Sequence, residues 1–272
     1  MDYPFRGQGH RYADYGKVTA SATNLTQLTA PLSNNEKGAW LEIVPSLAID
    51  ATGVLIHALA QSTANRSYLF DIGVGASGSE VAVIQNLFTT IGTSGAPICY
   101  HLPLSFPAAT RISARYQVDD ITSADLRVAF TGYMSGHYTG SPYHRIITLG
   151  ANTAASRGTR ITPVNGSKGD YAALTSSLSH DIHEILIVCG NSADFTLNAT
   201  SYQVDVAVGL DLSEQVIIPD LRYVGLNTID IFEPNVIGPF PVSISAGSRI
   251  AMRAQANSIN TDNLDFVLYG LS

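Results

Sequence analysis

The sequence predicts an all-β protein built from two tandem antiparallel β-sandwich domains with a jelly-roll-like topology. Three observations support this fold class. The chain repeats itself after about 130 residues, apolar residues alternate with polar ones along short segments, and glycine-rich turns separate those segments. We expect an N-terminal docking arm at residues 1–17, a first copy at 18–134, a linker at 135–145 and a second copy at 146–272.

The repeat begins where Lys37 and Trp40 recur as Lys168 and Tyr171, 131 positions later. Insertions of three and then four residues shift the register further along the chain. The middle block matches Tyr68, Asp71, Val74, Gly75, Ser79, Glu80 and Leu87 to Tyr202, Asp205, Val208, Gly209, Ser213, Glu214 and Leu221. Both insertions fall between apolar runs, where loops tolerate added residues.

The last block aligns residues 103–134 with 241–272 without a gap. Ten of its 32 pairs are identical, whereas average residue usage would give about two. The chain is therefore an internal duplication.

Period-two alternation identifies the strands, because successive side chains of a strand point to opposite faces. The apolar faces are Tyr68, Phe70, Ile72 and Val74; Tyr202, Val204, Val206 and Val208; Ile112, Ala114 and Tyr116; Leu126, Val128 and Phe130; and Leu264, Phe266 and Leu268. About eight such strands per copy, each with one solvated face, predict two packed sheets. The long connections favour a jelly roll. An immunoglobulin-like sandwich is the alternative, although the chain lacks a Cys…Trp…Cys framework.

Composition narrows the range of functions. Only 14% of the residues are charged, well below the roughly 25% of ordinary soluble domains. Such a profile is typical of secreted β-proteins and of subunits that bury surface in an assembly, so we expect a homo-oligomer, a trimer or a larger ring. The net charge of −7 repels phosphate backbones, so we expect no nucleic-acid partner.

The N-terminal segment has no apolar core typical of a secretory signal, and no stretch of 18 apolar residues occurs. We therefore expect synthesis in a cytoplasm and no membrane insertion. The two cysteines, Cys99 and Cys189, are not equivalent in the duplication and are interpreted as two separate buried thiols.

Two motifs resemble cofactor or metal sites. The run Gly73–Gly78 has the spacing of a dinucleotide fingerprint, but the β-branched residues that follow it do not predict the helix that the motif needs. The cluster His180–Glu184 contains two histidines that point apart in an extended chain, and the first copy has no histidine there. We interpret the first as a turn and the second as a solvated loop, and expect no cofactor and no metal.

Eight charges recur in both copies: Asp71, Glu80, Arg111 and Arg115, with Asp205, Glu214, Arg249 and Arg253. Arginines four residues apart on a strand share a face, so cross-strand pairing with carboxylates is the simplest interpretation. Specifically, we expect Arg111 and Arg249 to pair within their own copies. A ligand site common to both copies, such as a glycan clamp, is the alternative.

Two segments are candidate interfaces. The N-terminal arm carries aromatic and basic residues, namely Tyr3, Phe5, Arg6 and Tyr12. The connection 222–240 differs most between the copies and contains Tyr223, Ile231 and Phe232. Long loops are often functional, and we expect these side chains to anchor a neighbouring subunit or a sugar ring. A loop folded back onto its own sandwich is the alternative.

No catalytic set is recognisable: there is no Gly-x-Ser-x-Gly elbow, and the separation of acidic residues such as Asp230 and Glu233 is not readable from sequence. We therefore expect no catalytic site and no enzyme activity.

The segments Glu214–Pro219 and Pro241–Gln255, with weaker forms at Glu80–Gln85 and Pro103–Gln117, resemble β-sandwich repeats in virion proteins of tailed bacteriophages. The resemblance implies a virion structural protein: a tail-tip, fibre or baseplate component, or a head decoration. Its partners would be copies of itself and other virion proteins, with a host-surface glycan as a further candidate. A pair of carbohydrate-binding modules and a polysaccharide-degrading enzyme remain alternatives.

Overall fold

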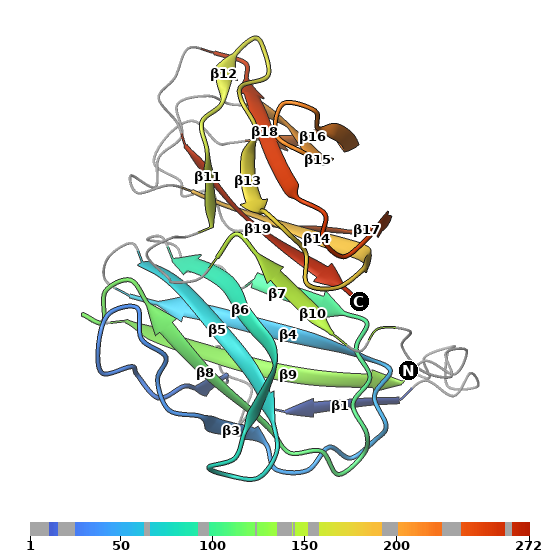
Figure 1. Cartoon of the computed structure of the whole chain (residues 1–272). Helices are drawn as coiled ribbons and strands as arrows, with labels where there is room; N and C mark the ends of the chain where they lie inside the picture. Colours follow the sequence, from blue (N-terminus) through green and yellow to red (C-terminus); the bar gives the residue numbers. More distant parts are fainter. Residues whose placement is uncertain are drawn as a thin grey trace, which may run out of the picture.

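The computed structural model describes residues 11–15, 25–62, 66–91, 98–122, 124–134, 143, 145–151, 158–191, 201–224, 235–258 and 263–272. Every regular element in these ranges is a β-strand, and none is a helix of the length and apolar character needed to cross a bilayer. The strands form four sheets, two in each half of the chain (Figure 1).

The first half contains nine strands: β1 (Arg11–Tyr15), β2 (Thr26–Gln27), β3 (Leu41–Val44), β4 (Gly53–Gln61), β5 (Arg66–Val74), β6 (Val81–Ile91), β7 (Ile98–Leu102), β8 (Ile112–Val118) and β9 (Asp125–Met134). One sheet has the order β1-β9-β4-β7, with β2 also on β9, and the other has β3-β8-β5-β6. All pairs are antiparallel.

The second half contains β10 (Ile146–Leu149), β11 (Thr159–Ile161), β12 (Val164–Asn165), β13 (Ala172–Thr175), β14 (Ile182–Asn191), β15 (Ser201–Val208), β16 (Gln215–Val224), β17 (Asn235–Ile244), β18 (Ile250–Ala256) and β19 (Leu264–Leu271). Its sheets are β10-β19-β14-β17, with β11 on β19, and β12-β18-β15-β16, with β13 on β18. The short β12 is parallel to β18, and the other pairs are antiparallel.

Both halves share one topology. If β1, β3 and β4–β9 are counted as strands one to eight, the sheets have the orders 1-8-3-6 and 2-7-4-5. Counting β10, β13 and β14–β19 in the same way gives the same two orders. Eight strands in two sheets connected in this way form a jelly roll. The predicted fold class, two tandem antiparallel sandwiches, is confirmed.

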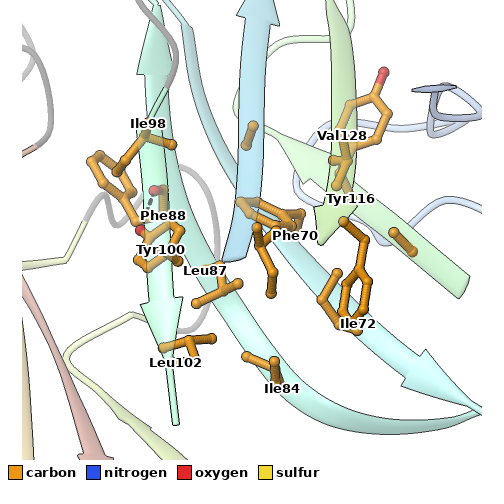
Figure 2. Packing of buried hydrophobic residues seen from close by; sticks show 14 of the residues in the cluster. Phe70, Ile72, Ile84, Leu87, Phe88, Ile98, Tyr100, Leu102, Tyr116 and Val128 are labelled. Atoms are coloured by element: carbon orange, nitrogen blue, oxygen red, sulfur yellow. Dashed lines mark hydrogen bonds between the residues drawn. The ribbon is translucent and has the colours of Figure 1, made fainter. Parts of the chain in front are cut away.

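The core of each sandwich follows the predicted alternation. Tyr68, Phe70 and Ile72 of β5 are fully buried, and Phe70 packs edge-on against Tyr100 with ring centroids 6.2 Å apart. Figure 2 shows these rings together with Leu87 between the strands.

The expectation of one solvated face fails for β5. Asp71 and Leu69, on its other face, are also buried. The segment before β3 covers them: Lys37 donates to the Leu69 carbonyl, and Trp40 lies so close to Gly73 that a Cβ there would be 2.7 Å from the indole ring. Gly73 is therefore required by close packing.

The predicted boundary of the N-terminal arm at residue 17 is also wrong in part. Residues 11–15 form the edge strand β1, paired with β9 from Tyr15 opposite Phe130 to Arg11 opposite Met134. The Tyr15 hydroxyl accepts a hydrogen bond from the Ala48 amide at 2.7 Å, which ties the strand to its own sandwich. This part of the arm therefore completes the first jelly roll.

The two sandwiches share a buried junction. Alternate residues of β19 enter different cores: Phe266 and Leu268 face the second core, whereas Val267 and Tyr269 belong to the same buried cluster as Phe88 and Tyr100 of the first half. The Tyr269 hydroxyl accepts from the Phe88 amide at 2.8 Å and donates to the Asn86 carbonyl at 2.9 Å, and its ring meets Tyr100 edge-on at 5.7 Å. Strand β19 and residues 185–189 of β14 are therefore buried on both faces.

Candidate functional site

The repeated charges gather into two equivalent clusters, one per sandwich. In the first, the buried Asp71 carboxylate accepts from Lys37 Nζ at 2.8 Å, Arg115 Nε at 3.0 Å and the Asn86 amide at 2.9 Å. Asn86 adopts a left-handed conformation with φ of 55°, which turns its amide toward the carboxylate. Three donors thus join β5, β6, β8 and the segment before β3.

The second cluster repeats this geometry around Asp205. Lys168 Nζ donates at 2.8 Å, Arg253 Nε at 2.9 Å and the Asp220 amide at 3.0 Å, and Asp220 has a φ of 53°. The clusters differ in that Lys168 also pairs with the Asp220 carboxylate at 2.9 Å, where the first copy has Asn86. The second lysine therefore has two carboxylate partners.

An aromatic ring covers each cluster. The Arg115 guanidinium lies 4.3 Å from the centre of the Trp40 ring, and the Arg253 guanidinium lies 4.6 Å from that of Tyr171. This is cation–π geometry. Desolvation raises the pKa of Asp205, but hydrogen bonds from the Asp220 amide, Lys168 and Arg253 outweigh it and hold the pKa below its usual value. Asp205 is therefore ionised at neutral pH.

A second pair of arginines holds the β5–β6 and β15–β16 hairpins. Arg111 donates to Glu80 at 2.9 Å and to Glu42 at 2.7 Å, and Arg249 donates to Glu214 at 2.7 Å. Desolvation raises the pKa of Glu80 and Glu214, but hydrogen bonds from these arginines and from backbone amides lower it below the usual value in both residues.

All eight repeated charges thus lie in intramolecular pairs. Arg111 and Arg249 each meet a glutamate of their own copy, and Arg115 and Arg253 meet the two aspartates. The sequence did not identify Glu42, Lys37 or Lys168 as partners, although both lysines recur at the same offset as the aromatic residues. The geometry of these clusters is that of cross-strand structural pairing.

The candidate interface residues differ in their exposure to solvent. Tyr223 was expected to be an exposed anchor, but it is 2% exposed and packs edge-on against Phe266 at 5.5 Å, so that expectation is wrong. The reason is that its position in β16, opposite Tyr202, directs the ring into the second core. Tyr12 is 67% exposed at the edge strand β1. Tyr3, Phe5, Arg6, Ile231 and Phe232 lie outside the described residues.

The two motifs that resembled cofactor or metal sites lie at the ends of strands. Gly73 lies within β5, which ends at Val74, and the residues after Val74 form the turn into β6, which begins at Val81. His180 lies beside Arg145, and the neighbouring Asp181 accepts from the Ala246 amide at 2.7 Å. Within the described ranges, no three His, Cys, Asp or Glu side chains converge as metal ligands.

The cysteine interpretation needs correction. Cys189 is buried in the second core, but Cys99 of the first half is exposed. Cys99 lies on the short strand β7 in a pattern in which buried and exposed residues alternate, and its neighbours Ile98 and Tyr100 are the residues that point inward.

The described residues form surface pockets at the junction and on both sandwiches. One, of about 450 Å³, lies at the junction and includes Gln85, Arg145 and His180. A second, about 270 Å³, lies on the second sandwich and is lined by Ser201, Gln203, Arg222, Gln255, Ala256 and Asn257. A third, about 210 Å³, lies on the first sandwich and is lined by Val74, Val83, Leu104, Ser105, Phe106, Pro107, Thr110 and Tyr143.

Comparison with known proteins leaves the family open. No family model matches the chain, and no curated protein does. Among solved structures, PNGF-II is 9% identical, with a TM-score of 0.42, over 96% of this chain and 65% of that one; this chain therefore spans less than two thirds of PNGF-II.

Two other structures have a TM-score of 0.40. The STIV MCP, a viral major capsid protein, is 10% identical over 91% of this chain and 96% of that one. A peptide-N(4)-(N-acetyl-β-D-glucosaminyl) asparagine amidase is 8% identical over 96% of both chains. The tandem CBM22-1–CBM22-2 domains of Paenibacillus barcinonensis Xyn10C, 9% identical, have a TM-score of 0.29 over 97% of this chain and 91% of that one. No residue role transfers from any of them.

Proposed function

We propose that the protein is a structural component of a bacteriophage virion, which assembles with copies of itself and with other virion proteins. The observation that carries this proposal is the buried junction around Tyr269, which joins two jelly rolls into one building block. Strand β19, which is buried on both faces, and the Tyr269–Tyr100 contact resist hinge motion between the two sandwiches. Such a block presents its outer surfaces in fixed orientations, as a shell or spike subunit requires.

The junction is asymmetric, which favours assembly. An outer sheet face of the second sandwich, with Leu186 and Val188, meets the β6 and β7 side of the first. Because the sandwiches are duplicates, each surface used in the junction has an equivalent on the other sandwich that the junction does not use. The equivalent of the β14 face is the β4 face, with the partly exposed Leu55 and His57. The equivalent of β6 is β16, with the exposed Arg222. A contact of this head-to-tail type between chains closes into a ring or propagates as a filament.

The low charge supports the same proposal. The eight repeated charges form ion pairs within the chain. Because these side chains are already paired, they add little to the cost of removing water from an interface. A role in the virion shell or spike also fits a duplicated fold whose repeated charges form structural pairs, and we expect no catalytic turnover.

Light scattering on the purified full chain tests the proposal. At micromolar concentration we expect a trimer or a larger ring, visible as closed particles by negative-stain electron microscopy. A monodisperse monomer across the micromolar range would refute self-assembly. Hydrolysis of polysaccharide by the same sample would refute the structural role.

The pocket on the second sandwich favours a second candidate, binding of a host-surface glycan. Amide groups line it, with the side chains of Gln203 and Gln255 joined by a 2.5 Å hydrogen bond and Arg222 beside them. Convergent polar groups in a hollow are typical of small-ligand sites. A glycan array should then show signal that falls for Arg222→Ala and Gln203→Ala, and an array without signal for the wild type would exclude this candidate.

A further inference from the structure

The tip of the β15–β16 hairpin presents two leucines to solvent. Leu210 is 77% exposed and Leu212 is 95% exposed. Leu212 also has a φ of 65°, a left-handed conformation that leucine rarely adopts because its Cβ crowds the backbone. Exposure and backbone strain both count against leucine here, so its presence is not explained by the folding of its own chain.

The duplication supplies an internal reference for this tip. In the first sandwich the equivalent positions are Ala76 and Gly78, and Gly78 has a φ of 81°. Glycine adopts this conformation without a steric penalty. The second copy therefore has the same left-handed turn, but an exposed leucine occupies the position where the first copy has glycine.

The tip is held rigidly. Arg249 donates to Asp211 within the tip at 3.3 Å and to Glu214 behind it at 2.7 Å, and the Ser213 amide donates to the Leu210 carbonyl at 3.0 Å. A fixed apolar projection loses little conformational entropy on binding, as is typical of an anchor residue.

The first sandwich carries an apolar pocket of suitable size. It measures about 210 Å³ and is lined by the apolar side chains of Val74, Val83, Leu104, Phe106 and Pro107, together with Ser105, Thr110 and Tyr143. An apolar cavity of about 150 Å³ accommodates benzene, so a leucine side chain fits in this pocket. Leu210 and Leu212 of the same chain do not occupy it, because both are exposed.

We propose that the Leu210–Leu212 tip of one chain inserts into the pocket lined by Val74 and Phe106 in a second copy, with Leu212 as the anchor. This inference rests on the self-assembly proposed above and adds a contact that is separate from the β4 face and the β16 strand. Because the tip belongs to the second sandwich and the pocket to the first, the contact is head-to-tail and leaves one tip and one pocket free on each pair for further subunits.

Leu212→Gly tests the proposal, because it restores the residue that the first copy has at this turn. We expect the dissociation constant of self-association to rise by about tenfold or more, while the melting temperature stays the same or increases, since the backbone strain is relieved. Leu32→Ser is the matched control: Leu32 is 93% exposed but lies elsewhere and is not left-handed, so its removal should leave association unchanged.

Cross-linking tests the pocket directly. In a Cys99→Ser background, Leu212→Cys combined with Ser105→Cys should form an interchain disulfide on oxidation, whereas Leu32→Cys combined with Ser105→Cys should not. If the wild type assembles but Leu212→Gly assembles equally well and the cross-link is absent, the proposed contact is wrong and self-assembly stands. A wild type that is monomeric would overturn both.

Discussion

Substituting the central aspartate of each cluster is the sharpest test of the structure, because the duplication provides two nearly identical sites. Asp71→Asn keeps the shape of the side chain but removes the charge that Lys37 and Arg115 share. Removing one partner of a buried ion pair typically costs about 3–5 kcal/mol, since the remaining charge is left without compensation. We therefore expect the free energy of unfolding to fall by about that amount.

Asp205→Asn should cost less. Lys168 keeps the Asp220 carboxylate at 2.9 Å, whereas the first copy has the uncharged Asn86 at the equivalent position. Asp220 is 61% exposed, and exposed pairs contribute about 0–1 kcal/mol. Asp71→Asn should thus lower the free energy of unfolding by up to about 1 kcal/mol more than Asp205→Asn does, because Lys168 still has one carboxylate partner after the substitution.

Thermal unfolding followed by circular dichroism measures both changes. At about 2–4 °C per kcal/mol, Asp71→Asn should lower the melting temperature by about 6–20 °C. The single tryptophan, Trp40, stacks on Arg115, so its fluorescence reports the first sandwich selectively. Asp120→Asn, which breaks only the half-exposed pair with Arg66, is the control and should change little. A small effect of Asp71→Asn, or a larger one of Asp205→Asn, would refute the reasoning.

Three further outcomes are expected. Tyr269→Phe should destabilise the protein by about 1–3 kcal/mol, since it leaves the buried Phe88 amide without its acceptor; urea denaturation would show no change if the contact were unimportant. Tyr223→Ser should cost about 3–5 kcal/mol, because it empties a core position, and an unchanged melting temperature would instead place this ring at the surface. Because the pKa values of Glu80 and Glu214 are lowered by folding, their contribution to stability is present above their ordinary pKa of 4.5 and is lost as the pH falls through the folded values; Glu→Gln at both positions should flatten the melting temperature between pH 3 and 5 relative to the wild type.

The fold class could be predicted from the sequence because it rests on local and repeated features. Strict alternation in segments such as Tyr68–Gly75 identifies a strand without knowledge of its neighbours, and the 103–134 and 241–272 match identifies the duplication. The pairing of the repeated charges was also predictable, because they recur at the same positions of both copies; the structure places Asp71 opposite Arg115 and Asp205 opposite Arg253.

A sequence signal for the junction was present but was interpreted differently. The uninterrupted apolar run from Ile185 to Cys189 contrasts with residues 54–58 of the first copy, where His57 stands in place of Val188 and interrupts the run. Continuous apolar runs are typical of strands buried on both faces. Such a run does not indicate which surface covers the second face.

Tertiary structure alone decided the remaining features. That Tyr223 turns into the core, that Leu212 stays exposed in a left-handed turn, and that Tyr269 bridges two domains all depend on contacts between residues far apart in the chain. Alternation along a strand specifies two faces but not what packs on either one. Local alternation and the internal repeat specify two β-sandwiches, whereas contacts between distant residues determine how the two pack into a single block.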